Sequence, residues 1–189
     1  GAVYQPLFTA FGPKAIGHRL EIAGSKVVVT DGANRTKLDG LDTVPPVLTV
    51  AGPRGEGVRR GDFSFWAELE QAADTFEPVM RTAEDPFLMM FTSGTTGLPK
   101  AVPVPLKAIL AFKGYMTEAV GLRAQDAFWN LADPGWAYGL YYAVTGPLSL
   151  GCPTTFYDGP FTVESTCRVI ERYRITNLAG SPTAFRLLM

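Results

Sequence analysis

Residues 87–105 read FLMMFTSGTTGLPKAVPVP, five apolar residues followed by a glycine- and threonine-rich segment, one lysine and three prolines. The apolar run is typical of a buried strand. In the segment after it, two glycines let the backbone approach a ligand closely, four hydroxyl side chains add hydrogen-bond donors, and the lysine supplies one positive charge. We therefore predict a phosphate-binding loop made of Thr92, Ser93, Gly94, Thr95, Thr96, Gly97 and Lys100.

This segment differs from the Walker A phosphate loop. Only two residues separate its glycines, where that motif has four, and an alanine follows Lys100 in place of serine or threonine. Pro103 and Pro105 exclude an uninterrupted helix after the loop, so we expect extended chain over residues 101–104. Phosphate binding then depends on backbone amides, hydroxyls and Lys100, without a helix N-terminus behind them.

Strand-like and helix-like runs alternate along the rest of the chain. We predict strands at 3–7, 26–30, 47–50, 127–131, 154–157 and 176–179, and helices at 13–23, 64–74, 106–122, 138–150, 163–173 and 182–189. Strands separated by helices of this length favour an α/β fold with layered, largely parallel sheets and crossover helices. We divide the chain into a first α/β subdomain, residues 1–80, and a second, residues 81–189, which carries the loop.

The spacing of apolar residues also predicts which side chains face a core. The β-branched run Val27–Val29 is typical of a strand buried on both faces. Trp66 and Leu69 fall on the inner face of one predicted helix, and Cys167 falls on the inner face of another. Two thiols make no disulfide framework in a chain of this size, so we expect both cysteines to be reduced.

Composition excludes several classes of protein. Lys and Arg number 17 against 18 Asp and Glu, a net charge of −1, which gives no basic field for nucleic acid. No run of about 18 apolar residues occurs, so we predict no membrane span. The chain begins in an apolar strand pattern without a leader and stops inside a helical pattern at Met189. We therefore expect an internal piece of a larger cytoplasmic protein.

The predicted loop resembles the phosphate-binding signature of the adenylate-forming superfamily, which includes AMP-forming acyl-CoA synthetases, firefly luciferase and the adenylation domains of peptide synthetases. The resemblance extends over essentially the whole chain. Residues 1–13 look like the stretch before the first strand–helix unit of acetyl- and medium-chain-type synthetases, residues 132–148 are similar to their acyl-pocket segment, and residues 179–183 resemble their next strand-to-helix turn. The resemblance implies part of the large N-terminal domain of such an enzyme.

What the resemblance implies is a two-step ligase. ATP and a carboxylic acid give an acyl-adenylate and pyrophosphate, and coenzyme A then accepts the acyl group. The loop would hold the β- and γ-phosphates, with Mg²⁺ bridging phosphate oxygens. Trp136, Ala137 and Tyr138 are the candidates for the acid pocket, because they lie where a strand end turns into a helix.

The resemblance also implies what this chain lacks. Many relatives have glycine after the motif lysine and a histidine a few residues on, whereas Ala101 and Val104 stand here, so we assign no histidine role. The family's adenine- and ribose-binding motifs and the lysine that promotes adenylation lie beyond this stretch. We therefore assign no catalytic residue within it, and we expect residues 1–189 alone to be inactive.

Two other functions stay open at this point: an adenylation domain that loads a carrier protein, and a non-catalytic nucleotide- or anion-binding module. For Trp136 and Tyr138, filling of a core between layers is the alternative to a pocket role. Asp133 and Asp158 belong to turn sequences with proline and glycine, so we assign them to turns. The sequence does not distinguish fatty from aromatic acids.

Overall fold

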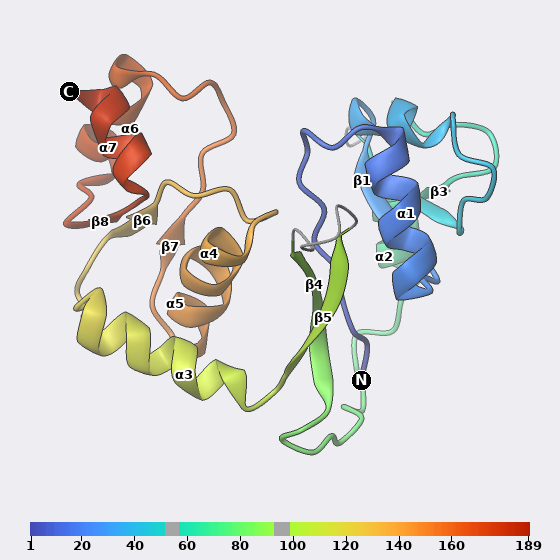
Figure 1. Cartoon of the computed structure of the whole chain (residues 1–189), viewed down its shortest axis with the longest axis horizontal. Coiled ribbons are helices and arrows are strands. Elements are labelled where there is room, and N and C mark those ends of the chain that lie inside the picture. Colours follow the sequence, from blue (N-terminus) through green and yellow to red (C-terminus); the bar gives the residue numbers. More distant parts are fainter. Residues whose placement is uncertain (52–56, 93–98) are drawn as a thin grey trace. The chain divides into compact units, whose positions relative to one another are not determined.

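The computed structural model describes residues 1–51, 57–92 and 99–189 (Figure 1). Its Cα atoms group into two compact units, residues 1–81 with 86–103 and residues 82–85 with 104–189. The strand before the predicted loop thus groups with the first unit. The division into subdomains 1–80 and 81–189 stays a prediction.

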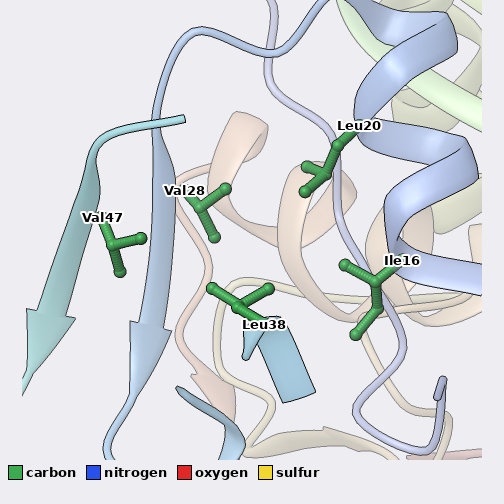
Figure 2. Packing of buried hydrophobic residues seen from close by; sticks show 5 residues of the cluster. All are labelled: Ile16, Leu20, Val28, Leu38 and Val47. Carbon is green, nitrogen blue, oxygen red and sulfur yellow. The ribbon is translucent and has the colours of Figure 1, made fainter. Parts of the chain in front are cut away.

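The first unit contains a three-stranded parallel sheet, in the order β1 (Val28–Asp31), β2 (Val47–Val50), β3 (Phe63–Ser64). Helix α1 (Pro13–Ala23) and the 3₁₀ turn η1 (Asn34–Leu38) complete its core. Figure 2 shows Ile16 and Leu20 of α1 pointing toward Val28, Val47 and Leu38, and these five residues form one buried cluster.

Helix α1 has the bounds that the sequence predicts. Pro13 lies in the first turn, where its missing N–H has no intrahelical partner to lose. Gly24 ends the helix with φ of 57°, a left-handed conformation that suits glycine, and its N–H donates to the carbonyls of Glu21 and Leu20. Both ends are therefore set by local chemistry.

Two predictions about buried faces in this unit are wrong. Val28 is buried, but Val29 is 58% exposed, because α1 covers one face of the edge strand β1 and adjacent side chains alternate between faces. In α2 (Phe65–Gln71), Ser64 caps the helix as predicted, yet Trp66 and Leu69 are exposed. The Trp66 indole N–H donates to the Ala51 carbonyl, which holds the ring along the surface.

Strands β4 (Pro86–Thr92) and β5 (Lys100–Pro105) pair as a two-stranded sheet and lie side by side in Figure 1. They run antiparallel, because Leu106, directly after β5, donates its N–H to the carbonyl of Asp85, directly before β4 (3.0 Å). The predicted strand 87–91 and the extended segment 101–104 are confirmed.

The predicted strand 3–7 is reduced to one bridge. Tyr4 pairs in parallel with Leu88, donating to the Phe87 carbonyl and accepting from the Met89 N–H. Pro6 has no N–H with which to continue a ladder.

A second parallel sheet lies in the second unit, in the order β7 (Thr154–Thr155), β6 (Phe128–Asn130), β8 (Asn177–Ala179). Two helical segments each continue into a π-helix: α3 (Ala108–Gly114) into η2 (Tyr115–Ala119), and α4 (Ala137–Gly139) into η3 (Leu140–Thr145) and then α5 (Gly146–Ser149). Helices α6 (Val163–Tyr173) and α7 (Pro182–Leu188) follow. The predicted α/β fold with largely parallel sheets is confirmed.

In the core of the second unit, side chains of β6 pack against side chains of these helical segments. Met116, Leu122, Phe128 and Cys152 form its buried cluster, with Tyr142 packed against them. The inward position predicted for Cys167 is wrong: both cysteines are free, but Cys152 is the buried one and Cys167 is exposed. Helix α6 instead turns Ser165, Thr166 and Val169 inward, and the Ser165 hydroxyl accepts the Thr162 N–H in the helix cap.

Candidate functional site

The ends of the predicted phosphate loop lie on the β4–β5 hairpin. Thr92 is the last residue of β4 and Lys100 is the first residue of β5, so the hairpin holds both at the same end. Ser93, Gly94, Thr95, Thr96 and Gly97 lie outside the described residues. The structure therefore places the two flanking residues of the loop, and the loop itself stays a prediction.

The charge at this end of the hairpin suits an anion. Thr92 and Lys100 are both exposed, and Lys100 makes no ion pair with any residue that the structure describes. From Thr92 to Pro105 the sequence holds no aspartate or glutamate that would repel a phosphate. At the opposite end of the hairpin the arrangement differs, because Lys107 is paired with Glu84 (Nζ–Oε2 2.7 Å).

The residue types at this end of the hairpin agree with the predicted phosphate-binding role. A compact ammonium and hydroxyls, with no competing carboxylate, are typical of sites that bind phosphate oxygens. Among the residues that the structure describes, no three or more His, Cys, Asp or Glu side chains gather into a group that could hold a metal ion.

The predicted acid-pocket segment lies in a tight turn after β6. The Asp133 carboxylate accepts the Gly135 N–H (2.6 Å), and the Asp133 carbonyl accepts the Trp136 N–H (3.0 Å). Asp133 is thus a turn residue, as predicted. A Cβ atom on Gly139 would lie 2.1 Å from the Asp133 carbonyl oxygen, so only glycine allows the helix to start this close to the turn.

The three predicted pocket residues differ in their surroundings. Trp136 is 50% exposed and caps α4 from the N-terminal side, so it does not fill a core between layers in this structure. Ala137 is the first residue of α4 and is half-buried. The Tyr138 ring packs at a steep angle on the Tyr142 ring, with centroids 5.3 Å apart. A role in acid binding stays a prediction for all three.

Tyr138 belongs to an aromatic cluster that the two π-helices bring together. Tyr115 of η2 stacks on Tyr142 of η3 with ring centroids 4.1 Å apart, and Phe112 of α3 stacks on Tyr141 at 4.3 Å. Burial, and then a hydrogen bond with Tyr115, raises the pKa of Tyr138. Burial and the neighbouring Tyr115 also raise the pKa of Tyr142. The phenols of Tyr138 and Tyr142 therefore stay protonated near neutral pH.

Sequence reasoning missed Tyr115, Tyr142 and Asn130 as neighbours of this segment. Tyr115 and Tyr142 lie in predicted helices, but the spacing of apolar residues in those helices does not indicate the π-turns that bring the two rings together. Asn130 gave a signal, since it is a polar residue inside an otherwise apolar strand just before the turn. It is almost fully buried, and its Oδ1 accepts the Ala132 N–H (2.9 Å).

The parallel sheets and the hairpin that carries the glycine- and threonine-rich segment agree with the fold expected from the resemblance to adenylate-forming enzymes. The family described as AMP-binding enzyme matches residues 1–189, and the chain belongs to this family. The crystal structure of a Brucella canis acyl-CoA synthetase is similar over the whole chain, with a TM-score of 0.94 and 60% sequence identity, and the match covers 34% of that protein.

Curated relatives agree with this assignment. Acetyl-coenzyme A synthetases of Helicobacter acinonychis and Bacillus subtilis are 32% and 34% identical over the whole chain, which covers 32% and 33% of their lengths. The chain thus spans about a third of the relatives it matches. A structure of the anthranilate CoA ligase AuaEII with anthranoyl-AMP, at 23% identity and a TM-score of 0.82, shares the fold. No helix in the described ranges has the length and apolar character to cross a bilayer.

Proposed function

We propose that this chain is part of an AMP-forming acid–thiol ligase that activates a carboxylic acid with ATP and transfers the acyl group to coenzyme A. The observation that carries the proposal is the exposed Lys100 at the loop end of the hairpin, without an ion pair among the described residues, in a chain of the AMP-binding enzyme family. Acyl-CoA and acetyl-CoA synthetases among its relatives support the reaction class.

The phosphate loop in this proposal consists of Thr92, Ser93, Gly94, Thr95, Thr96, Gly97 and Lys100. Formation of the acyl-adenylate leaves pyrophosphate, so negative charge gathers on the oxygens that this loop faces. Donors that are fixed before the reaction lower the barrier without reorganising. Mg²⁺, when bound with ATP, supplies further positive charge to the same oxygens.

Trp136, Ala137 and Tyr138 form one wall of the acid pocket in this proposal. They follow the carboxyl end of β6, and ligands of parallel α/β sheets bind at the carboxyl ends of strands. The protein acts in a reducing compartment, the cytoplasm, which suits the free thiols of Cys152 and Cys167.

The test is Lys100→Ala in the full-length ligase. Losing one charge-assisted contact to phosphate typically costs about 1.5–3 kcal/mol, so ATP–pyrophosphate exchange should slow by roughly 10- to 150-fold. Lys107→Ala is the matched control, because Lys107 is already paired with Glu84 at the other end of the same hairpin, and it should leave exchange unchanged. Equal exchange rates in the wild type and Lys100→Ala would remove Lys100 from the site.

The acceptor is tested in the same preparation. With coenzyme A present, the wild type should release a free acyl-CoA. An acyl-adenylate that accumulates in the presence of coenzyme A and is consumed only by a phosphopantetheine carrier protein would assign the chain to a carrier-loading adenylation domain instead.

A further inference from the structure

Asn130, at the end of the strand that leads into the candidate acid-pocket segment, carries a buried donor without a partner among the described residues. The residue is 4% exposed and ends β6. Its Oδ1 accepts the Ala132 N–H, which fixes the orientation of the amide, because only the oxygen can face a backbone donor. Its Nδ2 is buried and has no hydrogen-bond partner among the residues that the structure describes. A buried N–H in this state is destabilising unless something accepts from it.

The sheet points this donor toward the tyrosine-bearing helices. Side chains alternate along a strand, so Asn130 shares a face of β6 with Phe128. Phe128 belongs to the cluster that includes Met116 of η2 and has Tyr142 of η3 packed against it. Trp129 faces the other way, toward Tyr157 (ring centroids 6.4 Å apart). Asn130 therefore lies on the side of the sheet that carries Tyr138 and at the carboxyl end of its strand.

The charged residues of the segment 127–149 indicate which kind of ligand group could accept a hydrogen bond from Nδ2 of Asn130. Residues 127–149 contain no lysine, arginine or histidine and one acidic residue, Asp133, whose carboxylate is used in the turn. A carboxylate held against residues 127–149 would find no cation within that segment to pair with and would meet that aspartate. The uncharged amide N–H of Asn130 suits an uncharged acceptor oxygen instead.

We propose that the acid site takes a carboxylic acid whose chain or ring carries an uncharged oxygen (a hydroxyl, keto or ether group) and that Nδ2 of Asn130 donates to this oxygen. The inference rests on the proposed function, because it concerns the acid that the ligase activates. Asn130 is then a specificity-determining residue that contacts the far part of the acid, while the reacting carboxylate lies away from residues 127–149.

The experiment compares pairs of acids in the full-length ligase: hexanoate with 5-oxohexanoate, pentanoate with 4-hydroxypentanoate, and benzoate with its three monohydroxy derivatives. We expect at least one oxygenated acid to exceed its plain partner in kcat/KM by about tenfold or more, because a site built to hydrogen-bond an oxygen rejects the analogue that lacks it. The difference should appear in the KM for the acid, with the KM for ATP unchanged.

Asn130→Asp tests the residue itself. This variant keeps an oxygen to accept from Ala132 and removes the donor, so the preference should fall to about twofold or less. Asn177→Asp is the matched control on the neighbouring strand β8, because the Asn177 amide already donates to the Val120 carbonyl (3.2 Å); it should keep the preference. Asn130→Ala, which introduces no charge, should lose the preference like Asn130→Asp.

The outcomes separate the inference from the proposed function. An active ligase that treats every oxygenated acid and its plain partner alike overturns the inference and leaves the proposed function standing, and this comparison needs no variant. A preference that survives in Asn130→Asp or Asn130→Ala removes Asn130 from the site. Absence of ATP–pyrophosphate exchange with every acid overturns the proposed function and the inference together.

Discussion

Asp62 joins three elements of the first unit through one buried carboxylate. Its side chain is 4% exposed and receives two hydrogen bonds from the Arg35 guanidinium of η1, at 2.7 and 3.0 Å. The hydroxyl of Thr49, a fully buried residue in β2, donates to the same carboxylate at 3.0 Å. The hydrogen bonds from Arg35 lower the pKa of Asp62 and raise the pKa of Arg35.

This arrangement predicts how stability depends on pH. Because the pKa of Asp62 is lowered in the folded protein, its contribution is complete above the unfolded pKa, about 3.9, and is lost as pH falls toward the folded value. Asp62→Asn should cost about 1.5–3 kcal/mol at pH 7, and this difference from the wild type should shrink below about pH 4. Urea unfolding at a series of pH values measures it.

Asp39→Asn is the control for this prediction. Asp39 also pairs with Arg35, but its side chain is 49% exposed, and exposed ion pairs contribute little. We expect a much smaller loss of stability than for Asp62→Asn. Equal stability of Asp62→Asn and the wild type at pH 7 would show that the buried pair is no more stabilising than its neutral replacement.

At the scale of the elements, sequence patterns predicted where helices begin and end more accurately than they predicted which side chains are buried. The bounds of α1 and α6 follow from Pro13, Gly24 and the Thr162 cap, which act locally and can be found in the sequence. Burial depends on what packs against an element. Val29 lies in an apolar run and Cys167 lies at helical spacing from Val163 and Ile170, yet both are exposed, so the sequence pattern assigned both to a core wrongly.

The two candidate sites also differ in how much of their structure the sequence predicted. The loop sequence predicted a strand before the loop and extended chain directly after it, and β4 and β5 confirm both, whereas their pairing as a hairpin was not predicted. The surroundings of Tyr138 were not predictable, because they depend on two π-turns that shift Tyr115 and Tyr142 into contact from separate helices. A π-turn inserts one residue into a helix and is set by packing, which a pattern of period 3.6 does not detect.

The position of Ala137 at the start of α4 predicts how a substitution there changes the choice of acid. It is the first residue of α4, between the large side chains of Trp136 and Tyr138, so added volume here narrows the proposed pocket. In the full-length ligase, Ala137→Leu should favour short over long acids by about tenfold or more, since each excluded methylene is worth roughly 1–3 kcal/mol. Relative kcat/KM values for a ladder of straight-chain acids measure the shift.

Ala111→Leu serves as the control for this change, because Ala111 lies on α3 and is exposed. It should leave both the acid preference and the KM for ATP as in the wild type. If Ala137→Leu also leaves the preference unaltered, the segment is packing and the assignment of Trp136, Ala137 and Tyr138 to the acid pocket fails.

At the scale of the whole molecule, the chain spans about a third of the length of its curated relatives. In the part of the chain that the structure describes, each of the two units holds one small parallel sheet, and the hairpin with the predicted loop groups with the first. The proposed acid pocket belongs to the second unit. The two proposed sites thus belong to different units, and in the proposed ligase the reaction would require both, together with groups that bind adenine and coenzyme A.

We therefore expect residues 1–189, produced alone, to form no acyl-CoA from ATP, a carboxylic acid and coenzyme A. The resemblance to adenylate-forming enzymes assigns the adenine site and the adenylation-promoting lysine to later parts of such proteins. Binding of pyrophosphate by the loop needs neither, so calorimetry should still detect weak binding that Lys100→Ala abolishes. Chromatographic detection of acyl-CoA is the decisive measurement for the predicted inactivity. The Lys100→Ala chain, prepared in the same way, is the control for a contaminating host ligase. Turnover that is the same in both preparations comes from the contaminant, whereas turnover that disappears with Lys100→Ala belongs to the chain and would show that residues 1–189 contain a complete ligase.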